Sequence, residues 1–461
     1  LSNRKAGLHQ EDSEDFLQAY EAYQALLDSM QLLDFDDLLL RALAYMESEQ
    51  GQKKEGARLS YLLVDEFQDI SPLQYRLVKA WNQYGRELFV IGDPDQSIYG
   101  FRGSDAACFE RLGQDFEELQ TIRLIQNYRS VPAVTESAVS LINKNPGPER
   151  ILVANRPARS KVRLVHAKSA MGEAIFIAKE INRMVGGLDM LEAQEGNLIR
   201  EDKTPRSFDQ IAVLYRTHRQ GELLEKCLRR EGIPYVVAGR EEFLAGEKVK
   251  GCMAFLRYLA NPADAVSQRQ SLKLVWGLDD NEISRAILEA KAQEYRSFLP
   301  KGKPEKLIRQ WIEEWQLTQE EDMQKLLSMA MFYKTVPELL EMVSLGVESD
   351  LKRCGTKRYQ ADCVTLMTLH GSKGLEFPVT MIYGVNQGSI PYENQIRPAQ
   401  EEEERRLFYV GMTRARDELL LTTSGEPSCF LKDLSGQWLC RQEAEEGRGQ
   451  KPRQMSLFDF L

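Results

Sequence analysis

The sequence predicts an α/β fold with parallel sheets and a mostly helical insertion. Three short apolar runs, at 62–64, 88–91 and 211–215, each end in a polar or charged turn, which is typical of strands buried in a parallel sheet. Residues 240–350 instead carry apolar side chains mostly at helical spacing. Because 461 residues exceed the usual size of a single core, two or three domains are expected.

Composition narrows the class of protein. The chain is 43% hydrophobic and 28% charged, as in soluble globular proteins, and the lack of a long apolar run or a signal peptide predicts a cytoplasmic protein without a membrane partner. Seven scattered cysteines without a CxxC pair and four histidines without ligand spacing argue against a zinc site or a disulfide framework. With a formal net charge of −10, nucleic-acid binding would depend on local basic patches.

After a helical start at 1–58, the first predicted strand ends in two acids. The run 62–64 is interpreted as a buried strand, and Asp65 and Glu66 follow it at the carboxyl edge of the sheet, where open α/β sheets bind ligands. Asp65 supplies an oxygen ligand that Mg2+ can share with nucleotide phosphates, and Glu66 can take a proton from water. These residues predict a nucleotide site.

The next predicted strand, at 88–91, leads into a polar turn and then into an aromatic segment. Gln96 in the turn can reach the same phosphate as the acids. Tyr99, Phe101 and Arg102 follow within a few residues, and flat rings beside a cation suit stacking on single-stranded nucleic acid. One short segment is thus expected to contact nucleotide at one end and nucleic acid at the other.

The order of these elements resembles that of a known family. VDEFQD at 64–69 and GDPDQSIYGFRGS at 92–104 resemble motifs II and III of the UvrD/Rep/PcrA family of superfamily 1 DNA helicases, and LDFDDLLL at 33–40 resembles the segment before motif II. Extended motifs with internal order are far more specific than single patterns. The resemblance implies two RecA-like parallel-sheet lobes, the first incomplete, with ATP and Mg2+ bound between them.

Residues 122–130 resemble motif IV of this family. A predicted strand at 122–125 ends in QNYRS. The resemblance implies that Arg129 stabilises the transferred phosphate as an arginine finger does, and that Tyr128 stacks on the base of the nucleotide. The loop at 146–165, which holds prolines and arginines, is interpreted as solvated basic surface, with a phosphate contact as the alternative.

A strand–helix–strand pattern at 209–239 supports a second parallel sheet. Arg216 ends its first strand and is interpreted as a surface charge rather than a functional group. Residues 362–392 resemble motif V, which implies that Thr368 and His370 face the nucleic-acid backbone and that Glu376 accepts a hydrogen bond from the nucleotide ribose.

Residues 401–423 resemble motif VI. Four acids begin a predicted amphipathic helix and are interpreted as its solvated start. The resemblance implies that Arg414 is a second arginine aimed at the terminal phosphate, and the run 419–421 is expected to be the closing strand. In the family, a helical insertion contacts duplex DNA; the insertion here looks abbreviated, and whether it contacts duplex DNA is left open.

These observations predict five segments. They are the remainder of the first lobe at 1–120, the first part of the second lobe at 121–240, a helical insertion at 241–350, the second part of the second lobe at 351–424, and a flexible tail at 425–461.

The sequence contains no glycine-rich loop ending in Gly-Lys-Ser or Gly-Lys-Thr. The family carries this Walker A loop upstream of motif II, and its lysine supplies much of the nucleotide affinity. We therefore expect the chain to be a fragment that lacks the N-terminal segment of its first lobe, and to be inactive in ATP hydrolysis by itself.

The end of the chain is polar at 441–453, which predicts a disordered linker. The final segment, QMSLFDFL, resembles the short peptide by which bacterial proteins bind the sliding clamp. Leu457 and Phe458 would enter a surface pocket and Gln454 would make a polar contact, with docking of the tail on its own protein as the alternative.

The resemblance implies an ATP-dependent DNA helicase or translocase that steps 3′ to 5′ along single-stranded DNA in repair or replication. Two alternatives remain open at this point. One is a hydrolysis-deficient scaffold that binds single-stranded DNA, which the missing loop favours and the intact acids and arginines oppose. The other is a part of a RecB/AddA-like helicase–nuclease, which the short stretch after residue 423 disfavours.

Overall fold

A computed structural model describes most of the chain, namely residues 2–5, 14–54, 59–83, 85–105, 107–116, 118–158, 161–186, 205–238, 244, 246–296, 303–331, 333–345, 362–393 and 400–444. The chain divides into two compact units, one formed by residues 1–238 with 359–461 and the other by residues 239–358. The first unit holds all described strands, and the second is helical. None of the described helices has the length and apolar character needed to cross a membrane.

The first unit begins with the smaller of its two main α/β parts. Its elements are α1 (Ser2–Lys5), α2 (Glu14–Ser29), α3 (Phe35–Glu47), α4 (Glu49–Lys54), β1 (Tyr61–Val64), α5 (Pro72–Asn82), β2 (Glu87–Val90) and α6 (Cys108–Asp115). Helix α5 starts at a capping box in which Ser71 and Gln74 satisfy each other's backbone N–H groups, with Pro72 at the first helical position.

Strands β1 and β2 pair in parallel, with Leu62 opposite Leu88. One face of this two-stranded sheet packs against a cluster around Phe67 that includes side chains of α5 and α6. On the other face Leu63 is 72% exposed and Phe89 is 52% exposed. The expectation of a fully buried strand at 62–64 is therefore wrong, because the strand has one neighbouring strand and one covered face among the described residues.

The larger part is a seven-stranded sheet in which every paired strand is parallel to its neighbour. Its order is β11-β5-β10-β9-β6-β8-β7. The strands are β5 (Val162–His166), β6 (Ile211–Tyr215), β7 (Tyr235–Val237), β8 (Val364–Thr368), β9 (Phe377–Ile382), β10 (Ala415–Thr423) and β11 (Leu439–Glu443). The expected α/β fold with parallel sheets is thus confirmed.

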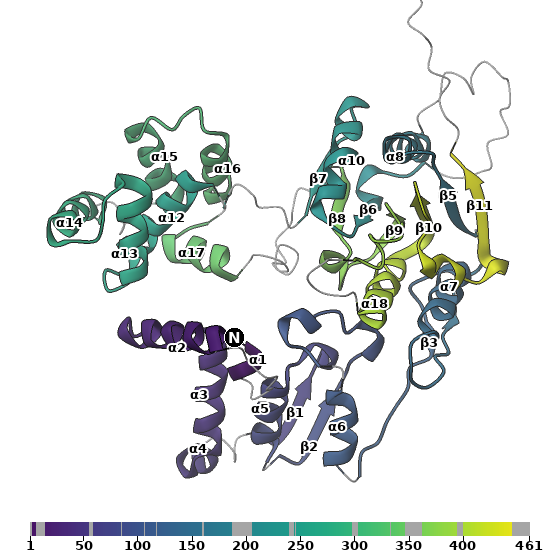
Figure 1. The fold of residues 1–461 in the computed structure, drawn as a ribbon, viewed down its shortest axis with the longest axis horizontal. Helices are drawn as coiled ribbons and strands as arrows, with labels where there is room; N and C mark the ends of the chain where they lie inside the picture. The colour runs from purple at the N-terminus through teal and green to yellow at the C-terminus, as the bar shows by residue number, and fades with distance from the viewer. Residues whose placement is uncertain are drawn as a thin grey trace, which may run out of the picture. The chain divides into compact units, whose positions relative to one another are not determined.

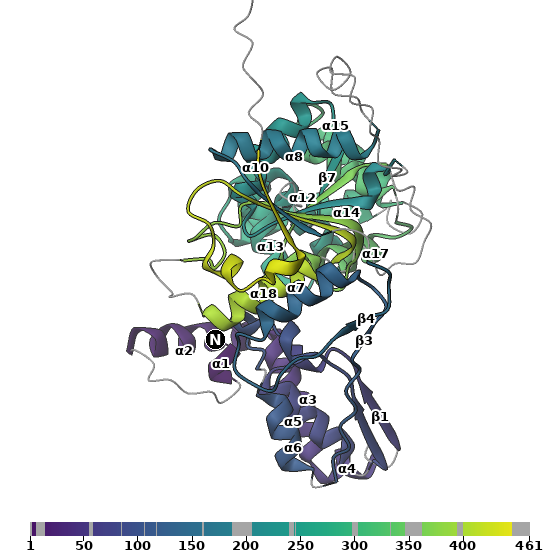
Figure 2. The ribbon, with the colours of Figure 1, turned by 90° about the vertical axis from the view of Figure 1, so that its right-hand side faces the viewer.

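Helices cover both faces of this sheet, as Figures 1 and 2 show. Helices α8 (Ala170–Met184) and α10 (His218–Arg230) lie on one face and share a core with Ile211 and Val213 of the interior strand β6. Helices α7 (Pro132–Ile142) and α18 (Glu401–Met412) lie on the other face and share a core with Ala212 and Leu214. A strand covered on both faces is apolar at every position, which explains the continuous run at 211–215.

Two strand predictions need correction. The run 122–125 forms no strand; a short strand β3 (Gln126–Asn127) follows it and pairs with β4 (Val153–Ala154). Leu124 is 84% exposed, so the apolar run has no sheet to enter. The strand at 419–421 does not close the sheet, because β11 (Leu439–Glu443) pairs with β5 at the edge. The tail expected to be flexible from residue 425 is therefore ordered at 439–443, which includes the first three residues of the expected linker.

The second unit is a helical bundle. Its helices are α12 (Glu247–Ala260), α13 (Ala265–Ser271), the π-helical turn η5 (Leu272–Trp276), α14 (Glu282–Arg296), α15 (Pro304–Glu314), α16 (Glu321–Ala330) and α17 (Val336–Leu345). Phe255 lies at the centre of its core, with ring centroids 4.7 Å from Trp311 and 5.3 Å from Tyr295. This unit confirms the helical insertion expected from the sequence pattern.

Candidate functional site

The acid loop after β1 has an unusual backbone. Glu66 adopts a left-handed conformation, with φ of 53° and ψ of 40°, and its N–H donates to Asp65 Oδ1 at 2.8 Å. Phe67 is fully buried, and its N–H donates to the carbonyl of Ile91 at 2.9 Å. Non-glycine residues with positive φ cost energy and cluster at functional sites. Here the tight turn buries the phenylalanine and leaves both acids exposed to solvent.

Gln68 fixes Glu66 to the neighbouring strand end, a role that the sequence did not reveal. Its Nε2 donates to Glu66 Oε2, and its Oε1 accepts the N–H of Asp93 at 3.0 Å. Gln68 is only 2% exposed. A Cβ on Gly92 would lie 2.6 Å from Gln68 Oε1, so glycine is needed for this close approach. The buried amide therefore sets the position of the candidate base.

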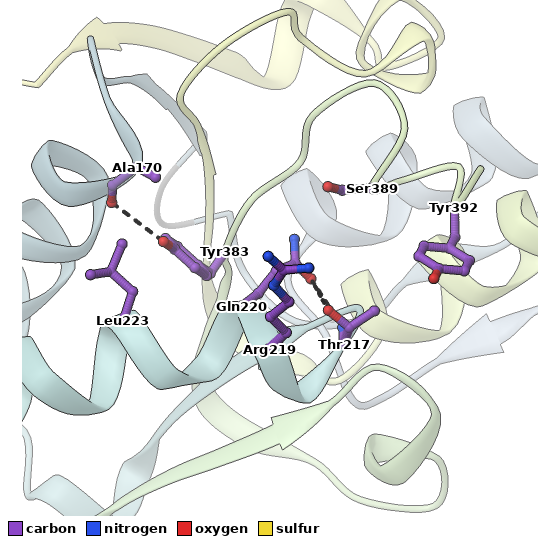
Figure 3. Close-up of a pocket in the computed structure, with 8 residues that line it drawn as sticks. All are labelled: Ala170, Thr217, Arg219, Gln220, Leu223, Tyr383, Ser389 and Tyr392. Carbon is purple, nitrogen blue, oxygen red and sulfur yellow. Dashed lines mark hydrogen bonds between the residues drawn. The ribbon is translucent and has the colours of Figure 1, made fainter. Parts of the chain in front are cut away.

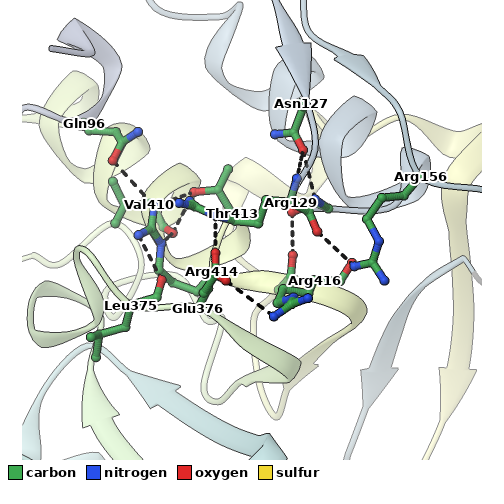
Figure 4. Close-up of polar contacts among 12 residues, drawn as sticks. Gln96, Asn127, Arg129, Arg156, Leu375, Glu376, Val410, Thr413, Arg414 and Arg416 are labelled. Carbon is green, nitrogen blue, oxygen red and sulfur yellow. Dashed lines mark hydrogen bonds and ion pairs between the residues drawn. The ribbon is translucent and has the colours of Figure 1, made fainter. Parts of the chain in front are cut away.

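Gln96 lies in the turn that follows β2, on the 3-10 helix η2 (Pro94–Gln96). Its Nε2 donates to Asp93 Oδ2 at 2.8 Å, and its Oε1 faces Arg414 Nη2 at 3.5 Å (Figure 4). Burial raises the pKa of Asp93, while the hydrogen bond from Gln96 opposes that shift. The structure thus brings Gln96 and Arg414 together, and their shared action on a phosphate stays a prediction.

Arg414 is a buried cation at the amino end of β10. Its side chain is 1% exposed, and it donates from Nε to the carbonyl of Val410 at 2.9 Å and from Nη1 to that of Leu375 at 3.1 Å. Burial, and then the nearby charge of Arg129, lower the pKa of Arg414 to about 10, so it stays protonated at neutral pH. Because carbonyl oxygens compensate its charge only in part, the site favours an added anion.

Arg129 follows β3 and forms an ion pair with Glu376. Its Nε donates to Glu376 Oε2 at 2.8 Å, and Arg416 Nη1 lies 3.5 Å from the other carboxylate oxygen (Figure 4). Tyr128 is 75% exposed beside them. Glu376, predicted to bind the ribose, is therefore held by two arginines, and a ribose hydroxyl would have to share its carboxylate.

Lys373 joins the two sheets, and the sequence did not single it out. Its Nζ lies 2.6 Å from both carboxylate oxygens of Asp69, donates to the carbonyl of Gln96 at 2.8 Å and lies 3.9 Å from Glu66 Oε2. Its side chain is 8% exposed. Burial raises the pKa of Asp69 even though Lys373 opposes the shift. The loop after β8 is thereby tied to the acid loop and to the Gln96 turn.

The donor set of the acid loop fits Mg2+. Asp65 offers an exposed carboxylate, and Mg2+ in nucleotide sites takes one or two protein carboxylates together with phosphate oxygens and water. Within the described ranges there is no group of three or more histidine, cysteine, aspartate or glutamate side chains that could hold a metal by itself. A magnesium ion at Asp65 would therefore need nucleotide oxygens to complete its shell.

The aromatic turn forms a separate cluster with the end of β8. Phe101 and His370 meet edge-on with centroids 5.6 Å apart, and the Arg102 guanidinium lies 5.3 Å from the Tyr99 ring centroid. Phe101 is 58% exposed. Thr368 Oγ1 accepts the N–H of Gly371 at 3.1 Å, which shapes the loop beside His370. The five residues predicted to contact nucleic acid are Tyr99, Phe101, Arg102, Thr368 and His370, and the structure gathers them at this turn and the end of β8.

His370 is neutral at physiological pH. Burial, followed by the charges of Arg216 and Arg102, lowers its pKa to about 4. It can therefore take part in stacking and neutral hydrogen bonds but adds no positive charge to the cluster. Arg102 supplies the cation beside the exposed rings.

Three charged groups interpreted as solvated are in fact engaged in contacts. Arg150 forms a two-point ion pair with Asp95, at 3.0 and 2.9 Å. Arg216 does the same with Glu404, at 2.7 and 3.1 Å, and stacks on Tyr392. In the acidic start of α18, Glu404 is 8% exposed, so that segment is not simply a solvated helix start. The partners lie far apart in sequence, which is why periodicity did not reveal them.

A separate cavity of about 360 Å³ lies at the start of α10 (Figure 3). Its lining includes Thr217, Gln220, Tyr383 and Tyr392. None of the predicted site residues lines it, and we assign it no role. The predicted clamp-binding residues Gln454, Leu457 and Phe458 lie outside the described residues.

Comparisons with known proteins agree with the motifs. The chain matches the UvrD/REP helicase N-terminal domain over residues 2–117 and the UvrD-like helicase C-terminal domain over residues 122–295 and 281–426. Together these matches extend over most of the chain.

Individual relatives carry helicase names. The ATP-dependent DNA helicase UvrD1 of Mycobacterium tuberculosis is 30% identical over 92% of this chain and 64% of its own length. The ATP-dependent DNA helicase Rep of Escherichia coli is 29% identical over 91% of this chain and 70% of its own length. The ATP-dependent DNA helicase PcrA of Staphylococcus epidermidis is 27% identical over 90% of this chain and 63% of its own length. The chain thus spans roughly two thirds of the length of these relatives. It belongs to the UvrD/Rep helicase family.

Proposed function

We propose that this chain is the motor part of an ATP-dependent DNA helicase or translocase that steps 3′ to 5′ along single-stranded DNA in repair or replication. The observation that carries the proposal is the approach of the buried Arg414 of the second sheet to Gln96 of the first. In the proposal, Arg414 and Gln96 act together with the acids of the first sheet on the terminal phosphate of a bound triphosphate.

The nucleotide side has a defined set of roles in this proposal. Asp65 holds Mg2+, Glu66 accepts a proton from the attacking water, and Gln96 contacts the terminal phosphate. Arg129 and Arg414 stabilise the charge that develops on the transferred phosphoryl group. These last two guanidinium groups already influence each other electrostatically in the structure.

The remaining nucleotide contacts surround the exposed ion pair. Tyr128 stacks on the base, which its 75% exposure permits. Glu376 accepts a hydrogen bond from the ribose while it orients Arg129. ATP would supply the phosphoryl group that is transferred to water. The chain's own residues would bind and orient the nucleotide and accept the proton of the attacking water.

In this proposal, single-stranded DNA binds at the aromatic turn, on what we call the strand side of the molecule. Phe101 and Tyr99 stack on bases, while Arg102 contacts phosphate or the face of a ring. Thr368 and His370 contact the backbone of the strand from the end of β8. The proposal draws support from the edge-on contact of Phe101 with His370, which joins the two sheets at one surface.

A phosphate-binding segment outside this sequence completes the nucleotide site in this proposal. The chain contains no Gly-Lys-Ser or Gly-Lys-Thr sequence, and the exposed apolar face at Leu63 and Phe89 offers a surface on which further strands or helices of the lobe would pack. We therefore propose that ATP turnover requires the longer product of the gene.

The proposal is tested by the hydrolysis of ATP in the presence of single-stranded DNA, with the longest product of the gene. Glu66→Gln is expected to abolish turnover while nucleotide binding is retained, because the amide cannot accept the proton. Glu87→Gln, an exposed acid on β2, is the matched control and should behave as the parent. Turnover of Glu66→Gln within severalfold of the parent would reject the assignment of the base.

The scaffold alternative predicts a different result in the same assay. A parent protein that binds single-stranded DNA and never hydrolyses ATP would favour it over the motor. The absence of the phosphate loop from this sequence is the observation that keeps this alternative in view.

The tail supports a second proposal, of clamp binding through Gln454, Leu457 and Phe458. Deletion of residues 454–461 is expected to eliminate capture by a bacterial sliding clamp in a pull-down with purified proteins. Replacing the polar stretch 445–450 by glycine and serine is the control and should leave capture intact. Equal capture of the parent and the deletion variant would reject the proposal.

A further inference from the structure

The guanidinium of Arg156 joins the two backbone segments that carry the arginines beside Glu376, and we propose that Arg156 is a positioning residue for Arg129. It holds the loop after β3 against the start of β10, so that the Arg129 side chain is in place before a nucleotide binds. The inference rests on the proposed function and adds to it a residue that acts through the backbone and does not itself contact the phosphate.

Arg156 lies two residues after β4, in the loop whose arginines we interpreted from the sequence as solvated surface, with a phosphate contact as the alternative. The structure gives it partners within the chain instead. Its Nη1 donates to the carbonyl of Arg129 at 2.9 Å and to that of Arg416 at 3.1 Å (Figure 4). Its Nη2 lies 2.6 Å from Asp417 Oδ1. A planar guanidinium with several N–H donors can bind two carbonyls and a carboxylate at once, and a lysine ammonium does not reproduce that geometry.

The Arg156 guanidinium is itself held by a partly buried ion network. Arg206 donates from Nη1 to the other carboxylate oxygen of Asp417 at 3.0 Å and from Nη2 to Glu418 Oε1 at 3.2 Å. The side chain of Arg156 is 24% exposed and that of Asp417 is 12% exposed. Burial raises the pKa of Asp417, but the hydrogen bonds and charges of Arg156 and Arg206 outweigh it and lower the pKa overall. The carboxylate is therefore ionised at neutral pH and anchors Arg156.

The residues that follow Arg129 attach the same loop to the start of β10. Ser130 Oγ donates to the carbonyl of the first residue of β10 at 2.6 Å. The N–H of Val131 donates at 3.0 Å to the same Arg416 carbonyl that Arg156 binds. Both Ser130 and Val131 are buried. Arg156 thus extends to Arg129 itself an attachment that begins at the buried residues after it.

The side chain of Arg129 is held less firmly than its backbone. It is 40% exposed, and its partner Glu376 is 44% exposed. Because an exposed ion pair contributes little to holding a side chain in one place, the position of the Arg129 guanidinium depends on the backbone that Arg156 fixes. A displacement of about 1 Å in a group that acts in the transition state can cost about 100-fold in rate. Loss of Arg156 should therefore affect the chemical step more than the binding of nucleotide.

The test measures steady-state ATP hydrolysis by the longest product of the gene with a saturating single-stranded oligothymidylate. Arg156→Met is expected to lower kcat by at least about tenfold while KM for ATP changes by less than about threefold, because only the transition state loses a contact. Arg163→Met is the matched control. Arg163, on β5 of the seven-stranded sheet, is 25% exposed and paired with the buried Glu180. Its loss should leave kcat within about twofold of the parent.

A double-mutant cycle separates positioning from a general effect on the fold. Arg129→Ala is expected to lower kcat strongly, and Arg156→Met should then lower it by less than about twofold further, because the group that Arg156 positions is gone. If Arg156→Met does not fold, Arg156→Lys takes its place in the cycle. It keeps a positive charge beside Asp417 but cannot bridge the two carbonyls, and it should lower kcat by at least about fivefold.

Three results would overturn the positioning role of Arg156. One is a parental kcat in a folded variant at this position. Another is a loss of the same factor with and without Arg129, which would indicate a purely structural role. The third is an equal loss in the control Arg163→Met.

The same measurements tell failure of this inference apart from failure of the proposed function. If Arg129→Ala keeps kcat within about threefold of the parent, Arg129 does not act on the phosphoryl group and the role of Arg156 falls with it. If Arg129→Ala lowers kcat strongly but Arg156→Met does not, the role of Arg129 stands and only that of Arg156 is overturned. A parent protein that never hydrolyses ATP would overturn the proposed function and this inference together.

Discussion

The nucleotide side and the strand side of this molecule are built differently. On the nucleotide side two polar side chains that hold the site are buried and hydrogen-bonded, Arg414 at 1% exposure and Gln68 at 2%. On the strand side Phe101 is 58% exposed. A buried polar network holds its groups in place before a ligand arrives, whereas an exposed ring gains contact area only when a base covers it. Changes on the first side should therefore affect turnover, and changes on the second should affect affinity.

The largest effect is expected at Arg414. Arg414→Ala should lower the rate of ATP turnover by ~1,000-fold or more, because it removes a preorganised cation from the charge that develops on the phosphate. Steady-state hydrolysis measures it, with the exposed Arg441→Ala as the control. A loss smaller than about tenfold in a folded variant would place the charge stabilisation elsewhere.

The next largest effect is expected at Gln68, which tests whether the buried hydrogen-bond network is needed to position Glu66, the candidate base. Gln68→Ala removes the amide that holds Glu66 and Asp93, and it should cost ~1–3 kcal/mol in the free energy of unfolding together with a loss of turnover. Chemical denaturation and hydrolysis assays check both effects. The exposed Gln114→Ala should change neither, and a silent Gln68→Ala would show that Glu66 needs no such support.

Phe101 gives the matching test on the exposed side. Phe101→Ala should weaken binding of single-stranded DNA by ~1–3 kcal/mol, because one stacked base loses its ring. A fluorescence titration measures the affinity, and Phe35→Ala, which removes an even more exposed ring from α3, should leave it unchanged. Equal affinities for the parent and Phe101→Ala would reject stacking at this position.

The pH dependence at His370 should be a gradual effect, small within any one pH unit. The pKa of His370 is about 4 in the folded chain against an ordinary value of 6.5, so between these values the unfolded chain binds the extra proton. Stability should then rise with pH across this window and lose this contribution as pH falls. The slope is at most about 1.4 kcal/mol per pH unit. His370→Gln should flatten that part of the profile in denaturation at several pH values; an unchanged slope would contradict the burial of a neutral ring.

The smallest effect is expected at the exposed ion pair of Arg129 and Glu376. Both side chains are about 40% exposed, so Glu376→Gln should change the free energy of unfolding by less than about 1 kcal/mol. Thermal melting at low and high salt checks this. A larger loss would mean that Glu376 has a structural role that its exposure does not reveal.

Much of this architecture follows from local sequence. The fully apolar run at 211–215 predicted a strand covered on both faces, and the order of acids, Gln96 and aromatic residues predicted groups that the structure brings to one region. The local pattern gave a wrong strand prediction where the apolar run has no neighbouring strand to pair with. The run at 122–125 is as apolar as a strand, yet no adjacent strand pairs with it among the described residues.

Other cross-sheet contacts could not be predicted. Lys373 meets Asp69 across 304 positions, and Glu403 meets Gly100 across 303. In the sequence, Lys373 and Glu403 cannot be told from ordinary surface charges, because hydrophobic periodicity describes only neighbours within one element. Their roles follow from the packing of two sheets, which a single sequence does not specify position by position.

The central claim is that acids of the first sheet and arginines of the second act on one triphosphate. The most direct test is a crystal structure of the longest gene product with a non-hydrolysable ATP analogue and Mg2+. We predict that Asp65 binds the metal ion and that Gln96 and Arg414 both contact the terminal phosphate. A terminal phosphate bound away from Arg414, with its guanidinium still bonded only to groups of the chain itself, would contradict the account.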